Sequence, residues 1–295
     1  MTGPANKYPA REVGSSLIDF VEASFALCKD ILLAPPSPGT EAEKQLGAQS
    51  SLAGQWAGSA PVREAQYSAI MAIVAGLDHA DVFAHALHDD IGSLALATVQ
   101  RGALESFARA HWMLTAANET ELVLRWASMT LSEIEIHMRH YDGAQFYVNG
   151  KLATGESIAA MVGRYIQSLT ERGKRADYKP TLIAQEYGSL LGPDGVQVYS
   201  RLSAIAHAQS FGIGQMLTST KTETGGTLEI VLSDRDAREY AEGVFSMTLT
   251  IIDELCVYYG CSPALHDPWV AQHARTLDTI TRAQQRPPSS PRRSQ

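Results

Sequence analysis

Three charged side chains stand at four-residue intervals in a long apolar stretch of the sequence. They are Arg101, Glu105 and Arg109, within the segment Ile91–Ala117. An α-helix turns once in about 3.6 residues, so these side chains lie in one line along a helix. Two arginines held by a carboxylate suit an anionic ligand group, because a guanidinium binds carboxylate, sulfate or phosphate through paired hydrogen bonds. The alternative is a solvent-exposed ladder of ion pairs, worth about 0.2–0.5 kcal/mol per pair.

A second polar group has the same helical spacing. Tyr199, Ser203 and His207 are four residues apart and share one helix face. A histidine in such a setting can act as a general acid or base. The alternative is a core histidine whose hydrogen bonds are satisfied. A Ser-His-acid triad is not indicated, because a serine and a histidine on one helix lack the strained turn and the oxyanion donors of such a nucleophile.

Two further helix faces carry an acid followed by two histidines. The first comprises Asp81, His85 and His88, and the second comprises Glu133, His137 and His140. Acids and imidazoles on facing helices can bind a metal, but the dimetal pattern of four-helix bundles is Glu-x-x-His. Charged, solvated helix faces are the alternative, and no metal ligand is assigned.

Two neighbouring polar residues precede the apolar stretch. Asp78 and His79 point about 100° apart on a helix, so one of them can face the Arg101–Glu105 line. The glycines at Gly212, Gly214, Gly225 and Gly226 do not follow a strand and open a helix, so they give no nucleotide-binding fingerprint. We therefore expect no cofactor.

The elements that must position these residues are mostly helices. Apolar residues recur with helical spacing along most of the chain, which predicts an all-α protein, an up-and-down bundle of eight or nine helices. The expected helices are 15–33, 62–88, 91–117, 120–141, 156–169, 181–191, 194–217, 233–259 and one that opens at Asp267-Pro268. Ser15 or Ser16 would cap the first of them. The helix at 91–117 carries so few charges that it should be mostly buried.

The remaining segments complete a single helical domain over residues 15–284. Gly143–Leu152 alternates and contains Asn-Gly, which indicates at most a short β-hairpin. Residues 1–14 are expected to be irregular, and residues 34–60 form a long connection that is either mobile or a lid. Residues 285–295 are rich in proline, serine and arginine and are expected to be disordered.

Composition limits the class of protein. The chain has 295 residues, 45% of them hydrophobic, and a formal net charge of −8, which disfavours non-specific binding to nucleic acid or to an anionic membrane. Its three cysteines lack metal-type spacing and suggest a reducing cytosol. We see no signal peptide and no uninterrupted apolar run of about 18 residues, so we expect a cytoplasmic protein with no membrane contact.

Several short motifs resemble those of a group of uncharacterised actinobacterial helical proteins, which are similar in turn to HEPN-like helical bundles. The motifs are Asp78-His79, Arg101-Gly-Ala-Leu-Glu105, Ala110-His-Trp-Met-Leu114, Tyr199-Ser-Arg-Leu-Ser203 and His207, and the resemblance covers about residues 60–260. The resemblance implies a HEPN-like core.

HEPN ribonucleases use an arginine and a histidine separated by four to six residues, act without metal and usually form dimers. By this resemblance Arg201 would stabilise phosphate charge, His207 would be the acid/base, and the protein would be a homodimer. The residue after the arginine is usually polar in that family, whereas here it is Leu202.

Three functional hypotheses follow. The first is a small-molecule enzyme or ligand-binding protein of bacterial metabolism, in which Arg101 and Arg109 hold an anionic group, Glu105 orients them and His207 moves a proton. Tyr199, Ser203, Asp78 and His79 would complete this site. The second hypothesis is a HEPN-type, metal-independent endoribonuclease. The third is a non-catalytic helical interaction protein whose polar stripes only specify packing.

Overall fold

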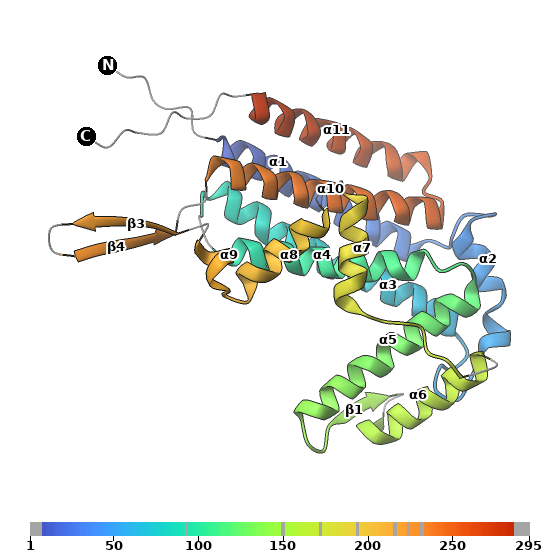
Figure 1. The fold of residues 1–295 in the computed structure, drawn as a ribbon. Coiled ribbons are helices and arrows are strands. Elements are labelled where there is room, and N and C mark those ends of the chain that lie inside the picture. Colours follow the sequence, from blue (N-terminus) through green and yellow to red (C-terminus); the bar gives the residue numbers. More distant parts are fainter. Residues whose placement is uncertain are drawn as a thin grey trace.

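Helices make up most of the chain, as the sequence predicts. The computed structural model describes residues 8–91, 94–148, 151–170, 173–192, 195–214, 217–222, 225–230 and 233–285. Within these ranges there are eleven α-helices, one short 3₁₀ helix and two β-hairpins (Figure 1). The all-α class is confirmed. The helix count exceeds the expected eight or nine because the long predicted segments at 34–60 and 194–217 contain short helices of their own.

The elements follow one another in this order: α1 (Ala10–Leu33), α2 (Glu41–Gly47), the 3₁₀ helix η1 (Gln49–Leu52), α3 (Pro61–His88), α4 (Ala95–Leu114), α5 (Glu119–His140), β1 (Gln145–Val148), β2 (Lys151–Thr154), α6 (Gly155–Leu169), α7 (Pro180–Leu190), α8 (Gly195–Ala206), α9 (Ser210–Gly214), β3 (Leu217–Thr222), β4 (Gly225–Ile230), α10 (Asp234–Tyr259) and α11 (Pro263–Gln285).

Helix α4 lies at the centre of the packing. It contacts α3, α5, α7, α8 and α10, while α1 packs between α3 and α11 (Figure 1). The expectation that α4 is mostly buried is confirmed, and Ala103, Phe107 and Ala110 are fully buried. Helix α3 approaches it closely at Gly76, where an added Cβ would lie 2.4 Å from Cε1 of Phe107. The two helices therefore pack closely where a residue without a side chain faces a large ring.

The first and last long helices begin earlier than predicted. Helix α1 starts at Ala10 after Pro9, so the expected cap by Ser15 or Ser16 is wrong, and residues 10–14 are helical. The buried side chains of Tyr8 and Val13 extend the apolar stripe back beyond the serines. Helix α11 starts at Pro263 and contains Pro268, where a helix start was expected. At the other end Gln285 is still helical, and residues 286–295 lie outside the described residues.

The predicted helix over 194–217 is interrupted. Helix α8 ends at Ala206, and Ala208 takes a left-handed conformation with φ 54°. The N–H of Gln209 donates to the carbonyl of Ala204 and the N–H of Ala208 to that of Ile205, both at 2.9 Å. These two bonds are those of a Schellman motif, which usually places glycine at the left-handed position. The chain therefore turns directly after His207.

The connection at 34–60, expected to be either mobile or a lid, is folded. It contains α2 and η1, and Thr40 caps α2 by accepting a hydrogen bond from the N–H of Glu43. Buried Gln45 accepts from the hydroxyl of Tyr258, and Gln66 of α3 donates to the carbonyl of Ala42 at 3.1 Å. These buried bonds attach the segment to α3 and α10, which disfavours a freely moving lid.

Two antiparallel hairpins exceed the single short hairpin that we expected. Strands β1 and β2 pair from Gln145↔Thr154 to Val148↔Lys151 and confirm the prediction at 143–152; the Asn149-Gly150 turn lies outside the described residues. Strands β3 and β4 pair from Leu217↔Ile230 to Thr222↔Gly225 and extend away from the helices (Figure 1).

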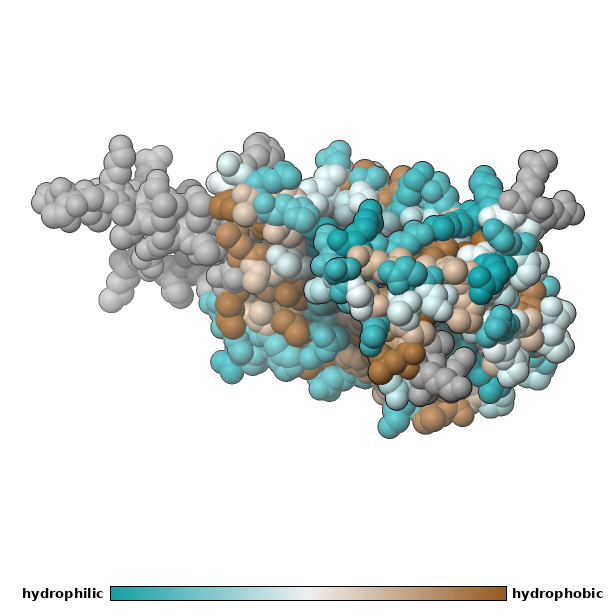
Figure 2. All heavy atoms as spheres, turned by 90° about the horizontal axis from the view of Figure 1, so that it is seen from below, coloured by the Kyte–Doolittle hydropathy of each residue, from teal (hydrophilic) through white to brown (hydrophobic). Residues whose placement is uncertain are grey.

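One helix, α3, is long and apolar enough to cross a membrane by length and composition alone. Half of its most apolar stretch is buried inside the molecule, as in a core helix of a soluble protein. The face of the molecule seen in Figure 2 mixes hydrophilic residues with groups of hydrophobic ones. Exposed hydrophobic side chains such as Val257, Leu33 and Tyr147 lie on different elements. The structure is compatible with a soluble protein.

Substitution by alanine should have opposite effects on stability at two glycines, one at the contact between α3 and α4 and the other in α6. Gly76→Ala should lower the free energy of unfolding by about 1–3 kcal/mol, because its Cβ would overlap Phe107. Gly163→Ala in α6 should raise it by up to about 1 kcal/mol, since nothing lies within 4 Å of an added Cβ and alanine favours a helix. Urea unfolding of both variants measures the difference, and equal effects would contradict this account of the core.

Candidate functional site

Four of the predicted site residues meet where α8 packs on α4. The Nε of Arg101 donates to Oε1 of Glu105 at 2.8 Å, and its Nη1 lies 2.8 Å from Nε2 of His207. The hydroxyl of Tyr199 donates to the same Glu105 oxygen at 3.2 Å. We call Arg101, Glu105, Tyr199 and His207 the Arg101 cluster.

Local structure fixes each member of the Arg101 cluster. Arg101 and Glu105 are four residues apart on α4, and the guanidinium lies 5.8 Å from the centre of the Tyr199 ring. Tyr199 is buried in α8, and the N–H of His207 donates to the carbonyl of Ser203 at 3.0 Å, in the last turn of that helix. Ser203 thus holds His207 through its backbone rather than through its hydroxyl.

The bond between Arg101 and His207 determines what the imidazole can do. A guanidinium has only donors, so Nε2 of His207 accepts and the neutral ring carries its proton on Nδ1. The lone pair that a general base would use is therefore engaged, while the Nδ1–H remains a donor. His207 is exposed and the Arg101 side chain keeps 20% of its surface accessible, so an external ligand can reach both. The geometry favours donation to an anion over removal of a proton.

Arg109, the third member of the predicted line, does not join the cluster. Its Nη1 lies 2.9 Å from Glu133 of α5, and its guanidinium lies 6.0 Å from the centre of the Tyr178 ring. The predicted line of charges is therefore split, since Arg101 and Glu105 face α8 whereas Arg109 faces α5. The expectation that Arg101 and Arg109 hold one ligand group together is not supported by this arrangement.

Asp78 and His79 lie in different surroundings, as their 100° separation on the helix predicts. Asp78 is exposed on α3. The ring of His79 lies over Gly102, where an added Cβ would come within 2.7 Å of Nε2, next in sequence to Arg101. His79 therefore packs against α4 at the residue next to Arg101.

Arg201 lies on another side of α8 from His207. Its Nη1 donates to Oε2 of Glu239 on α10 at 2.7 Å, and its guanidinium lies 5.4 Å from the centre of the Tyr240 ring. Arg235 donates to the other oxygen of Glu239 at 2.7 Å. Burial acts to raise the pKa of Glu239, but the bonds from the two arginines outweigh it and hold that pKa below its ordinary value. Because Arg201 and His207 have different partners, the HEPN-type pairing gains no support.

The two acid-histidine faces are engaged in other contacts. His85 lies 3.6 Å from Asp81, His88 lies 2.9 Å from Asp89, and the ring of His137 packs against Tyr141 and Phe146. Within the described ranges no group of three His, Cys, Asp or Glu side chains is placed to hold a metal ion.

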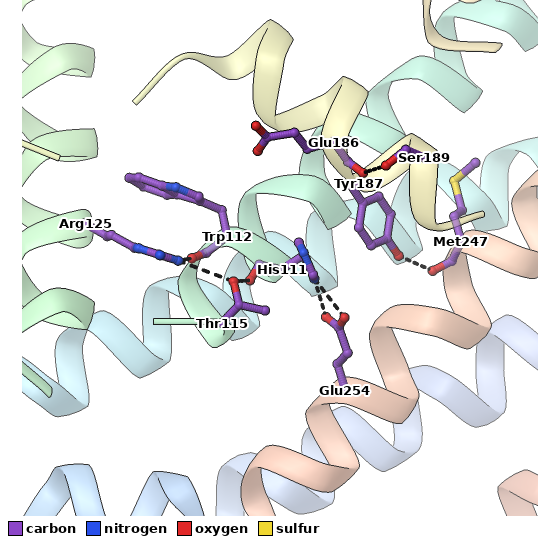
Figure 3. Close-up of polar contacts among 9 residues, drawn as sticks. All are labelled: His111, Trp112, Thr115, Arg125, Glu186, Tyr187, Ser189, Met247 and Glu254. Atoms are coloured by element: carbon purple, nitrogen blue, oxygen red, sulfur yellow. Dashed lines mark hydrogen bonds and ion pairs between the residues drawn. The ribbon is translucent and has the colours of Figure 1, made fainter. Parts of the chain in front are cut away.

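A histidine-carboxylate pair that we did not predict joins α4 to α10 (Figure 3). Nδ1 of His111 lies 2.8 Å from each carboxylate oxygen of Glu254, and its ring centre is 5.4 Å from that of Tyr187. The Tyr187 hydroxyl donates to the carbonyl of Met247 at 2.7 Å, and burial raises its pKa well above the ordinary value. These bonds tether α4 and α7 to α10. The only signal in the sequence was the histidine near the end of an apolar helix.

Arg125 of α5 binds the C-terminal end of α4. Arg125 donates to the carbonyl of Trp112 and, at 3.3 Å, to the hydroxyl of Thr115 (Figure 3). The guanidinium also lies 5.3 Å from the centre of the Trp112 ring. A cation at the carbonyl end of a helix is favourable, so Arg125 closes α4.

Comparison of this chain with protein-family models, with curated proteins and with solved structures finds no match. The resemblance to HEPN-like bundles and to actinobacterial helical proteins therefore stays an expectation from short sequence motifs.

The three cysteines are free and differ in their surroundings. Cys28 is buried, and burial raises its pKa to about 12. Cys261 is half-buried, and a hydrogen bond from the Cys256 thiol lowers its pKa, although burial opposes this. Cys256 is buried as well, so Cys261 is the cysteine whose surroundings most favour the thiolate.

These surroundings predict selective alkylation. Iodoacetamide at pH 7.5 or thereabouts should modify Cys261 at least about tenfold faster than Cys28, because the thiolate is the reactive form and Cys28 is both buried and protonated. Peptide mass spectrometry of the native protein over time measures both rates. Cys261→Ser provides the control, and equal rates for the two sites would contradict the assignment.

Proposed function

We propose that this protein binds a small molecule through an anionic group, which contacts Arg101 and His207 between α4 and α8. The observation that carries the proposal is the hydrogen bond from Arg101 Nη1 to His207 Nε2. It fixes the guanidinium and leaves the Nδ1–H of an exposed imidazole as a second donor. Carboxylate, sulfate and phosphate all accept from such a pair.

The surroundings of Arg101 support binding rather than structural pairing alone. Glu105 Oε1 accepts from Arg101 and from Tyr199, so the carboxylate holds the guanidinium in one orientation. A preorganised guanidinium loses less entropy when it binds, which strengthens binding. The expected homodimer and the cytoplasmic location remain predictions within this proposal.

The proposal favours a ligand-binding role over acid/base catalysis. A general base needs a free lone pair within hydrogen-bond reach of its proton. Nε2 of His207 faces Arg101 instead. General-base catalysis through Nε2 of His207 would require Arg101 to leave this bond first.

The test compares two arginines of the same helix. Thermal unfolding is followed in increasing phosphate or sulfate, with chloride keeping the ionic strength constant. Specific binding should raise the Tm, since a ligand at a hundred times its Kd stabilises by about 2.7 kcal/mol. Arg101→Gln should weaken the effect about tenfold or more, because hydrogen bonds to charged groups contribute about 1.5–3 kcal/mol. Arg109→Gln, which removes an arginine paired with Glu133, should leave the effect unchanged.

His207 provides a second readout in the same titration. The imidazole signals in nitrogen-correlated NMR spectra should shift with phosphate in the wild type and in Arg109→Gln, but not in Arg101→Gln. An equal loss in both arginine variants would contradict the proposal, as would a phosphate effect no larger than that of chloride.

A further inference from the structure

A cavity of about 800 Å³ lies among α7, α8 and α10, on another side of α8 from the Arg101 cluster. Its volume is within the range of about 300–1,000 Å³ that is typical of small-molecule sites. Leu104 of α4 and Ala204 of α8 line it, together with Met247 of α10, whereas Arg101, Glu105 and His207 do not. The cavity is therefore a site separate from the one proposed above.

Contacts on several sides hold the walls of the cavity in place. Helices α7 and α8 meet at Gly188 and Gly195, where a Cβ on Gly195 would lie 1.6 Å from the Gly188 carbonyl oxygen. The Tyr187 hydroxyl ties α7 to the Met247 carbonyl of α10 at 2.7 Å. The ion pair between Arg201 and Glu239 ties α8 to α10. A cavity framed in this way is largely preformed, which lowers the entropic cost of binding.

The lining is apolar over most of its surface and charged along the contact between α8 and α10. Apolar side chains come from α4, α8, α10 and the residue that follows α7, namely Leu104, Val196, Val198, Ala204, Met247 and Leu191. The charged part consists of Arg201, Arg235 and Glu239, with Glu242 turned toward Gln284 of α11, which donates to it at 2.6 Å. Such a lining fits a molecule that has an apolar body and one charged end.

The balance of donors and acceptors decides the sign of that charge. Arg201 and Arg235 share the single carboxylate of Glu239, which uses both oxygens on them. Within the described residues Arg201 donates to Glu239 through Nη1 and Arg235 through Nε, while Glu242 accepts from Gln284. The remaining guanidinium N–H groups therefore exceed the carboxylate oxygens at this end of the cavity. A second carboxylate would supply the missing acceptor atoms.

We infer that the cavity binds an amphipathic monocarboxylate, with its apolar chain against Leu104 and Met247 and its carboxylate at Arg201 and Arg235. This inference does not depend on the Arg101 cluster, and it names a ligand class for a part of the molecule that the proposed function leaves unused.

Isothermal titration of the full chain with dodecanoate, below its micellar concentration, tests the inference. Dodecanoate should bind the wild type at least about tenfold more tightly than dodecyltrimethylammonium, which has the same chain and the opposite charge. Arg201→Gln should weaken dodecanoate binding about tenfold or more. Ser246→Trp, which places a large ring in the cavity, should do the same without changing the charge. Circular dichroism and the Tm establish that both variants fold.

Two control variants distinguish binding in this cavity from binding at the Arg101 cluster or at any surface arginine. Arg282→Gln removes an arginine of α11 that is paired with Asp278 at 3.1 Å outside the cavity, and it should leave dodecanoate binding unchanged. Arg101→Gln should also leave dodecanoate binding unchanged. The phosphate test of the Arg101 cluster and the dodecanoate test of the cavity can therefore succeed or fail independently. Absent binding to the wild type, equal affinity for the cation, unchanged binding to Ser246→Trp, or a loss with Arg101→Gln would each overturn the inference.

Discussion

A helix that packs against several others can place charges only where a partner or solvent receives them. Helix α4 contacts five neighbouring helices, α3, α5, α7, α8 and α10, and burying an unpaired charge in such a position would cost several kcal/mol. Its polar residues therefore occupy the seams between neighbours. Arg101 and Glu105 lie at α8, Arg109 lies at α5, and His111 lies at α10. The burial of α4 thus restricts its charged side chains to the contacts with neighbouring helices.

The sequence alone predicts which side chains lie together on one helix. The four-residue interval predicts that Arg101 can bond Glu105, and the structure has this bond at 2.8 Å. It also places Tyr199 and His207 on one face of α8, and both join the same cluster. The helical class and the buried stripe of α4 follow from apolar periodicity in the same way.

The sequence alone does not predict which residues from distant parts of the chain contact one another. The spacing allowed Arg109 to face the same ligand as Arg101. In the structure, the packing of α5 beside α4 places Glu133 next to Arg109 instead. Glu254 is 143 residues from His111, and no short-range pattern relates them. The cavity is made by α7, α8 and α10 together, so its existence depends on how the helices pack, which periodicity does not specify.

The turn after His207 has a consequence for how this chain can vary. Ala208 has a positive φ, a conformation that costs an L-residue with a Cβ about 1 kcal/mol and costs glycine almost nothing. Branched side chains are excluded there, because they would clash with the backbone in this conformation. The position therefore accepts alanine at a cost, favours glycine or asparagine, and disfavours branched residues. A lineage that lost the left-handed turn would continue α8 as a straight helix, and the imidazole one residue earlier would no longer be presented at a helix end.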